Sequence, residues 1–354
     1  MAFQRAAGYN NLPNGVFSPT IFSKKVQKAF RKSSVIEDIT NNDYFGEIAN
    51  YGDSVKIIKE PEISVRKYAR GTQTTSQELL DSDFTLIVDR ANYFQFRVDD
   101  IEVSQSHVNW EDMASDRAAY RLKDAHETDV LGYLAGYEAV EANGITTWVP
   151  RTAPVGTKAD VNAGADELLT TQKLGRNAFV GSETNNSKSI VTGVSGTYDA
   201  TPLQIMNRMA RILDQQNVDK EGRWFVADPV FWEMMQDENS KLVDNDYAGG
   251  QDAGDVLRKN NGMKGMIRGF RVYVSNNLPY VGNGADVTTA GGSATNFGLL
   301  LAGHDSAVAT ASQINKTESF RDPDSFGDIV RGMQMYGRKI LRPESLIQAK
   351  YSKN

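Results

Sequence analysis

The chain has 354 residues, of which 40% are hydrophobic and 24% charged, and its formal net charge is −6. This composition is ordinary for a soluble globular protein, and the length allows two or three domains with sizeable cores. The absence of cysteine excludes disulfides, thiolate metal sites and cysteine nucleophiles, and the acidic balance argues against a generally basic nucleic-acid binder. No apolar run reaches the length of a membrane span or of a signal-peptide core, so we expect synthesis in a cytoplasm and no membrane partner.

The first segment of the chain is basic. No acidic residue precedes Glu37, whereas six basic residues do: Arg5, Lys24, Lys25, Lys28, Arg31 and Lys32. Ser18 and Pro19 predict the start of a short amphipathic helix, with serine as N-cap and proline at the first helical position. Two interpretations stay open, a solvated tail or an arm that lies on an acidic neighbour.

Residues 51–98 have the alternating pattern of β-structure. Four runs are rich in β-branched or aromatic residues: 54–58, 63–68, 84–88 and 93–98. A polar tip separates the first two runs from the last two, with basic residues before it and acidic residues after it. Because a long two-stranded arm is marginally stable alone, we expect it to lie on other structure.

Residues 109–141 predict one long helix. Asn109 is a good N-cap, and Glu111 and Asp112 follow in the first turn, where the helix dipole favours acidic groups. The first half is apolar on one side, whereas the second half, from Val130, is apolar nearly all round. Such a helix must be covered on most sides by other parts of the chain or by other chains. At about 1.5 Å per residue it would form a spine about 50 Å long.

The rest of the chain mixes a weakly patterned region with clear elements. Residues 143–200 are rich in Gly, Thr, Asn and Ser, with one helical candidate at 165–174, and predict a surface insertion or a segment ordered by contacts elsewhere. Helices are predicted after Thr201 and Asp228, each a cap residue followed by proline. Strands are predicted at 223–227, 270–275, 297–302 and 328–341, and 305–312 is a further helical candidate.

The stretches that resemble catalytic or metal-binding motifs are each incomplete or wrongly placed in this sequence. His126-Glu127 begins like a zinc-protease helix motif, but Val130 stands where the second histidine must be. The glycine-rich stretch 262–269 precedes a strand and does not open a helix, so turn formation explains it better than phosphate binding. The acidic loop 322–328 resembles a calcium loop, yet Phe326 occupies a ligand position. We therefore expect no enzyme, no cofactor and no metal.

The order of the parts resembles the major capsid proteins of tailed bacteriophages, which have the Hong Kong 97 fold. The resemblance covers about residues 17–346 and is most specific in four stretches: Arg223-Trp-Phe-Val-Ala-Asp-Pro, 267–279 with its Asn-Asn-Leu-Pro end, 302–308 and 326–344. Each stretch is weak alone, but all occur in the family's order.

The resemblance implies an α+β fold in five parts. These are an N-terminal arm at 1–49, an extended β-hairpin loop at 50–98, a peripheral domain with the spine helix at 99–142, an axial domain at 143–304 that includes a candidate surface insertion at 143–200, and a segment at 305–354 that returns to the peripheral domain.

The resemblance also implies a structural shell protein that self-assembles into hexamers and pentamers of an icosahedral capsid enclosing double-stranded DNA. It would reside in the virion after assembly in the host bacterial cytoplasm. Implied partners are other copies of the chain, a scaffolding protein, a portal, a decoration protein and packaged DNA held non-specifically. Two alternatives stay open: an encapsulin-like nanocompartment shell around protein cargo, and an enzyme or binding protein that forms small oligomers.

Intersubunit contacts are expected at two basic groups. Arg66, Lys67 and Arg70 of the extended loop should meet acidic groups of an adjacent subunit. The residues expected to lie along a neighbour or to face packaged DNA are Lys24, Lys25, Lys28, Arg31 and Lys32.

Covalent locking of the shell is not expected. Some family members join a lysine of the extended loop to an asparagine of a neighbour. Lys56, Lys59 and Lys67 are candidate lysines, but no asparagine occurs between Lys316 and Lys353. We therefore expect a shell held together by non-covalent contacts.

Overall fold

The computed structural model describes residues 34–41, 54–59, 63–71, 73, 76–77, 82–105, 110–142, 145–150, 168, 172–174, 188–190, 199–236, 263–282, 296–323 and 325–353. Its helices are α1 (Ile36–Ile39), α3 (Asp100–Gln105), α4 (Trp110–Ala135), α5 (Pro202–Gln215) and α6 (Pro229–Met235). The basic residues before Ser34 and the predicted helix that begins at Ser18 lie outside the described residues.

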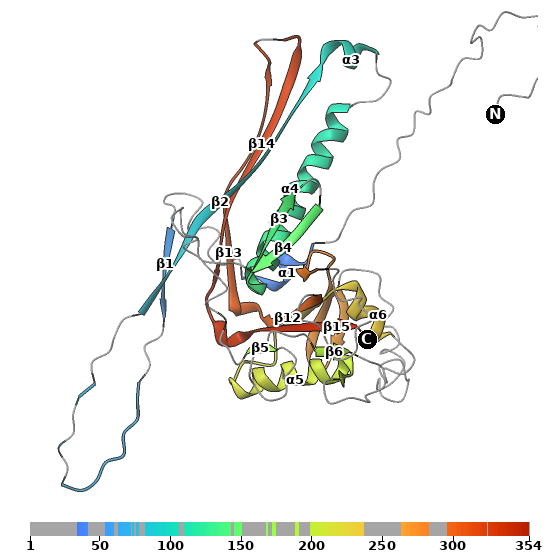
Figure 1. Ribbon diagram of the computed structural model, residues 1–354. Helices are drawn as coiled ribbons and strands as arrows, with labels where there is room; N and C mark the ends of the chain where they lie inside the picture. Colours follow the sequence, from blue (N-terminus) through green and yellow to red (C-terminus); the bar gives the residue numbers. More distant parts are fainter. Residues whose placement is uncertain are drawn as a thin grey trace, which may run out of the picture.

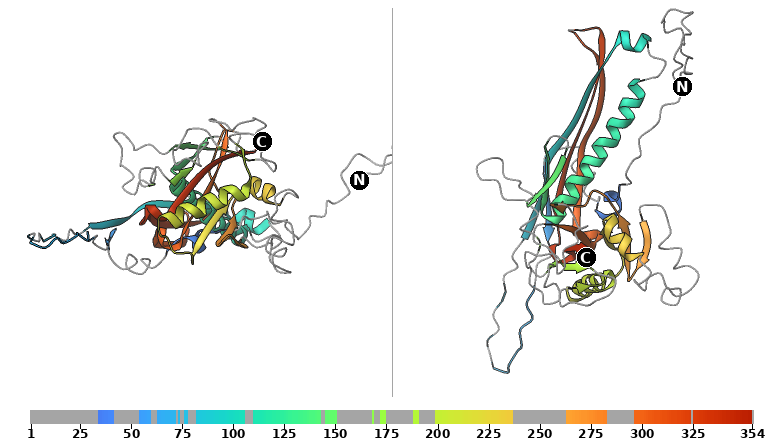
Figure 2. Two further views of the ribbon diagram at one scale, coloured as in Figure 1. Left: turned by 90° about the horizontal axis from the view of Figure 1, so that it is seen from below. Right: turned by 45° about the vertical axis from the view of Figure 1, so that its right-hand side comes forward.

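A four-stranded antiparallel sheet forms a long arm that rises beside α4 (Figures 1 and 2). Its order is β1 (Ser54–Lys59), β2 (Ser82–Asp99), β14 (Gly327–Ile340) and β13 (Val308–Arg321). The strand predicted at 328–341 is confirmed, and the runs 84–88 and 93–98 belong to one continuous strand, β2. The helical candidate at 305–312 is wrong, because only Asp305–Ala307 make a 3₁₀ turn and the β-branched residues after it pair with β14.

The predicted strand at 63–68 is also wrong. Residues 63–71 have no ladder partner among the described residues and form one side of an exposed loop between β1 and β2. Across this loop, Gln77 Oε1 accepts from the Ser64 hydroxyl at 2.8 Å and from the Ser64 amide at 3.2 Å. A strand-like sequence alone does not make a strand where no partner edge is available.

The spine helix is shorter than predicted. α4 ends at Ala135 and Gly136 follows at φ 70°, a conformation that ends helices and favours glycine. The chain then forms the hairpin β3 (Tyr137–Ala142) and β4 (Ile145–Pro150), which folds back onto α4. A Cβ atom on Gly132 would lie 2.8 Å from the Trp148 ring, so this glycine allows the close approach. The hairpin thus covers part of the helix half that is apolar all round.

A nine-stranded sheet forms the second body. Its strands are β5 (Lys173–Leu174), β6 (Lys188–Ile190), β7 (Asp199–Ala200), β8 (Arg223–Ala227), β9 (Met263–Ile267), β10 (Phe270–Val274), β11 (Tyr280–Val281), β12 (Phe297–His304) and β15 (Leu346–Lys353). The main path runs β7-β6-β15-β12-β8-β10-β9. The strands predicted at 223–227, 270–275 and 297–302 are confirmed. The helical candidate at 165–174 is wrong at its end, where β5 pairs with β15.

Both faces of this sheet are covered, which explains why its strands are apolar without alternation. Phe225 and Leu300 pack with α5 and α6 on one face, whereas their neighbours Val226 and Leu301 pack with α1 and α4 on the other. The predicted starts of α5 and α6 are confirmed: Thr201 forms a capping box with Gln204, and Asp228 accepts the Phe231 amide. The C-terminal half of α4 therefore joins the sheet to the arm.

Candidate functional site

The predicted basic loop is exposed along its length. Arg66, Lys67 and Arg70 lie in the segment 63–71, every residue of which is exposed. Two large apolar side chains in the same segment are also exposed, Val65 at 98% and Tyr68 at 70%. The loop projects away from α4 in both views (Figures 1 and 2). The other predicted contact residues, Lys24, Lys25, Lys28, Arg31 and Lys32, lie outside the described residues.

A buried arginine couples the arm to the spine. Arg338 of β14 is fully buried, and its Nε lies 2.8 Å from Asp129 Oδ2 of α4. Its Nη1 lies 3.4 Å from Asp89 Oδ1 of β2, and its guanidinium stands 4.7 Å from the centroid of the Tyr133 ring. Two carboxylates and an aromatic face thus replace the water that the buried cation loses.

A β-bulge supplies one of these carboxylates. The β2–β14 register pairs Tyr336 with Arg90 but Gly337 with Val88, so Asp89 is the extra residue on β2. Bulges re-aim side chains, and here the bulge residue is the one that meets Arg338. As a result, Arg338 of β14 contacts both β2, through Asp89, and α4, through Asp129.

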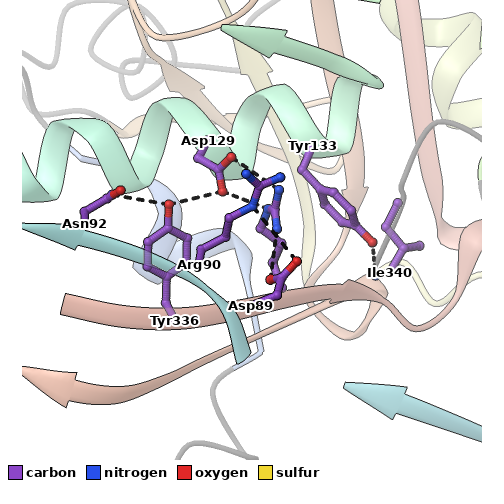
Figure 3. A network of polar contacts seen from close by, with 8 residues as sticks. Asp89, Arg90, Asn92, Asp129, Tyr133, Tyr336 and Ile340 are labelled. Atoms are coloured by element: carbon purple, nitrogen blue, oxygen red, sulfur yellow. Dashed lines mark hydrogen bonds and ion pairs between the residues drawn. The ribbon is translucent and has the colours of Figure 1, made fainter. Parts of the chain in front are cut away.

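Hydrogen bonds extend this contact along the helix, as Figure 3 shows. Tyr336 Oη donates to Asp129 Oδ2 at 3.2 Å and accepts from Asn92 Nδ2 at 3.4 Å. One turn further along α4, the Tyr133 hydroxyl accepts the Ile340 amide at 3.3 Å. Burial raises the pKa of Tyr336 above its usual range, so this hydroxyl stays protonated at physiological pH. The arm is therefore held to the spine by polar groups at several levels.

A second polar cluster joins α4 to the nine-stranded sheet. Glu127, 1% exposed, accepts from Ser275 Oγ at 2.6 Å, at the start of the Ser-Asn-Asn-Leu-Pro stretch. Asn277 Nδ2 donates to Asp124 Oδ1 at 2.9 Å. Burial raises the pKa of Glu127, with the hydrogen bonds from Ser275 and Ser34 opposing that shift. The Ser-Asn-Asn-Leu-Pro stretch, which the sequence analysis singled out, thus connects α4 to the nine-stranded sheet.

The far end of the arm carries ion pairs around the β13–β14 turn. Arg321 pairs with Asp100 of α3, which lowers the pKa of that carboxyl, and also lies 3.5 Å from Asp328. Asp322 lies 3.5 Å from Arg97 and accepts from Ser325. The two described acidic residues of the loop at 322–328, Asp322 and Asp328, are therefore paired with arginines at the turn between β13 and β14.

Two grooves flank the arm. The first, about 550 Å³, lies between α1, α4, β13 and β14 and has three basic groups, Lys123, His126 and Lys316, beside one carboxylate, Glu37. The second, about 680 Å³, lies between β2, α4, the β3–β4 hairpin and the turn before β11. Its charged lining residues are Asp124, Asp129, Glu138, Glu141, Arg90 and Arg121. We call the second one the acidic groove.

The two histidines that the structure describes, His126 and His304, have structural partners, whereas His107 lies outside the described residues. His126 meets the Tyr336 ring edge-on with centroids 4.5 Å apart, and burial lowers its pKa. His304 contacts Ser306 and the carbonyl of Glu221. In the described part of the chain, no three His, Cys, Asp or Glu side chains gather as a metal site would require. Among the helices that the structure describes, none combines the length and the apolar character needed to cross a membrane.

The Arg338 contact and the acidic groove were missed at the sequence level. A signal for the first exists: Tyr336, Arg338 and Ile340 share one face of an alternating strand, which places a charge where a core residue is expected. On α4, Asp129 and Tyr133 stand four positions apart and share a face. The acidic groove has no such signal, because its walls come from segments far apart in sequence.

No protein-family profile matches the sequence, and no curated protein matches it either. Solved structures do match over almost the whole chain. A Mycobacterium phage Che8 structure is 23% identical with a TM-score of 0.65 and covers 96% of this chain and 98% of that one. The capsid structure of cyanophage P-SCSP1u is 18% identical, TM-score 0.65, with 98% and 97% covered. The capsid of Ralstonia phage GP4 is 13% identical, TM-score 0.65, with 99% of both chains covered. The resemblance seen in the sequence is confirmed at the level of structure: the chain has the α+β fold of bacteriophage capsid proteins.

Proposed function

We propose that this protein is the major shell protein of a bacteriophage capsid, assembling through hexamers and pentamers into an icosahedral particle around double-stranded DNA. The observation that carries the proposal is the end-to-end match to phage capsid structures, with 98% and 97% of the two chains covered for the cyanophage P-SCSP1u capsid. A match of this extent includes the arm, the spine and the loop as well as the compact sheet body.

The shape of the subunit supports this role physically. A loop with Val65 and Tyr68 largely exposed and a sheet arm extending from the body leave apolar surface uncovered in one copy. Large exposed apolar surface is unfavourable in a monomer and is covered when subunits interlock. In a closed shell each contact recurs by symmetry, so weak ion pairs add up over many copies.

The structural matches favour this function over an encapsulin-like compartment, because the cyanophage P-SCSP1u and Ralstonia phage GP4 structures are capsids. The test is to express the full chain with and without a scaffolding protein and to examine it by size-exclusion chromatography and negative-stain microscopy. We expect closed particles, which in phage-infected cells hold nuclease-protected DNA. Small oligomers under all conditions would contradict the shell function, and protein cargo without DNA would support the compartment.

The proposal extends to partners and contacts. A scaffolding protein, a portal and a decoration protein are the proposed partners, with the particle assembled in the host cytoplasm and packaged DNA held non-specifically. The arm residues proposed to lie along a neighbour or to face DNA are Lys24, Lys25, Lys28, Arg31 and Lys32. Arg66, Lys67 and Arg70 are proposed to meet acidic groups of an adjacent subunit. Each exposed pair contributes about 0–1 kcal/mol, so single alanine substitutions should be tolerated, whereas reversal of all three to Glu should block or destabilise particles.

A further inference from the structure

Resting on the proposed shell function, we infer that the acidic groove is the docking site for residues 63–71 of a second copy of the chain. The groove supplies carboxylates and an aromatic surface, and the loop supplies basic and apolar side chains that are exposed to solvent in one copy. In this arrangement, Arg66 and Lys67 of one copy lie beside Glu138 and Glu141 of the other.

Charge selects this groove over the other one. The acidic groove has four carboxylates and two arginines, a balance of −2. In the other groove the charges are already paired, since Lys123 lies 2.8 Å from Glu37 and Lys316 pairs with Glu318. A segment with three positive charges within five residues is therefore attracted more strongly to the acidic groove than to the other groove, whose lysines and glutamate are already paired.

Within the acidic groove, two carboxylates are left for a partner. Asp129 is engaged by Arg338, and Asp124 by Asn277 and Arg121. Glu138 and Glu141, by contrast, are exposed on β3 and form no ion pair with any described residue. Tyr280, 43% exposed at the same groove, offers an aromatic surface to Val65 or Tyr68. The lining thus matches both the charge and the apolar character of the loop.

In the structure, the loop lies far from the acidic groove of its own subunit (Figure 1). It leaves β2 at Ser82, whereas the groove begins at Arg90, eight residues along the same strand. At about 3.3 Å per residue the two points are about 26 Å apart. From β2 the loop extends away from α4 and from the β3–β4 hairpin (Figure 1). The occupant must therefore come from a second copy.

A charge-swap experiment tests this site. The variants are Glu138→Lys with Glu141→Lys, Arg66→Glu with Lys67→Glu, and the combination of all four substitutions in one chain. We expect each double variant to raise the subunit concentration at which particles form by about tenfold, equivalent to about 1.4 kcal/mol. The combined variant, in which the opposite charges meet again, should return to within about threefold of the parent chain. Thermal unfolding of unassembled subunits should be similar for all variants.

A matched control carries the same charge change elsewhere. Asp38→Lys with Glu221→Lys alters two exposed carboxylates outside the acidic groove and should assemble like the parent. If the parent forms no particles, the shell function fails. If the parent assembles but the combined variant is not rescued, or the control is as impaired as the groove variant, the shell function stands and this docking site is wrong.

Discussion

Arg338 shows how a single residue fixes the relation between the arm and the spine. A guanidinium removed from water is costly unless partners replace its hydration, and here Asp129, Asp89 and the Tyr133 ring do so. The same three partners belong to β2 and α4, so the cation can be satisfied only when both elements are in place. Such a group contributes to the choice of one arrangement over others as well as to stability.

Replacement of Arg338 by methionine should destabilise the subunit by about 2–4 kcal/mol, because it removes the buried cation that Asp129 and Asp89 share. Both carboxylates keep some access to water, which places the cost in the lower part of the range for buried pairs. Urea unfolding of the unassembled subunit measures it. The matched control is Arg331→Met on the same strand, whose exposed pair with Glu318 should cost less than about 1 kcal/mol. Equal costs for the two variants would contradict the role given to Arg338.

Asp228 should give the subunit a measurable pH dependence. Burial raises its pKa to about 6, against the opposing hydrogen bonds from Tyr351 and the Phe231 amide. Since the unfolded carboxyl titrates near 3.8, the folded chain holds more protons between about pH 4 and 6, and stability falls as pH rises through that window. The loss should approach about 3 kcal/mol and then level off above pH 6.

Asp228→Asn tests this, because asparagine keeps the helix cap but does not titrate. Chemical unfolding at a series of pH values should show a smaller decline for the variant than for the parent between pH 4 and 6. The same slope in both proteins would assign the pH dependence to other groups.

Among the helices and strands, the sequence predicted correctly those whose sequence signals lie within a few residues of one another. The strand at 223–227 and the starts of α5 and α6 depend on apolar runs and on Thr-Pro and Asp-Pro caps, which act over a few residues. The end of α4 was missed although Gly136 marks it, since the apolar run continues past the glycine into β3. Residues 63–68 have a strand-like composition, but pairing depends on an edge that the described chain does not offer them.

The contact between β2 and β14 should be sensitive to one glycine. A Cβ atom on Gly337 would lie 2.4 Å from the Ile87 carbonyl oxygen, which is backbone and cannot move aside without shifting the strand. Gly337→Ala should therefore cost about 1–3 kcal/mol and disturb the bulge that presents Asp89. Hydrogen exchange of β2 amides, together with urea unfolding, would detect both effects.

Gly332→Ala on the same strand is the comparison. Its Cβ would meet the Phe94 ring at 2.4 Å, but the obstacle is the far end of a side chain that can rotate. We expect this variant to cost less than Gly337→Ala and to leave the exchange of amides near Asp89 unchanged. The reverse order would show that the arm packs more tightly at its middle than at the bulge.

At the scale of the whole molecule, two bodies share the C-terminal half of α4. The nine-stranded sheet is closed on both faces, whereas the arm and the loop present surface to the outside (Figure 1). The sequence predicted the order of these parts through the family resemblance. It could not predict how they meet, because Arg338 with Asp129 and Glu127 with Ser275 are contacts between residues distant along the chain.

Mature particles should contain no covalent bonds between subunits. The sequence has no cysteine, and no asparagine stands between Lys316 and Lys353 to receive a loop lysine. Particles boiled in detergent should therefore give one band near 39.1 kDa on a denaturing gel. A ladder of higher multiples would contradict a shell held by apolar burial and ion pairs alone.

The position of β15 has a consequence for synthesis on the ribosome. Within the described sheet, β15 joins β12 to β5 and β6, so the strands on its two sides are connected only through it. All of these strands are translated before β15, and a nascent chain therefore carries an open, apolar sheet edge until residues 346–353 emerge. Pairing at such long sequence separation makes folding slow. A prematurely terminated chain would keep that edge open and become a substrate for chaperones and proteases, so that only chains translated through β15 can present a closed subunit.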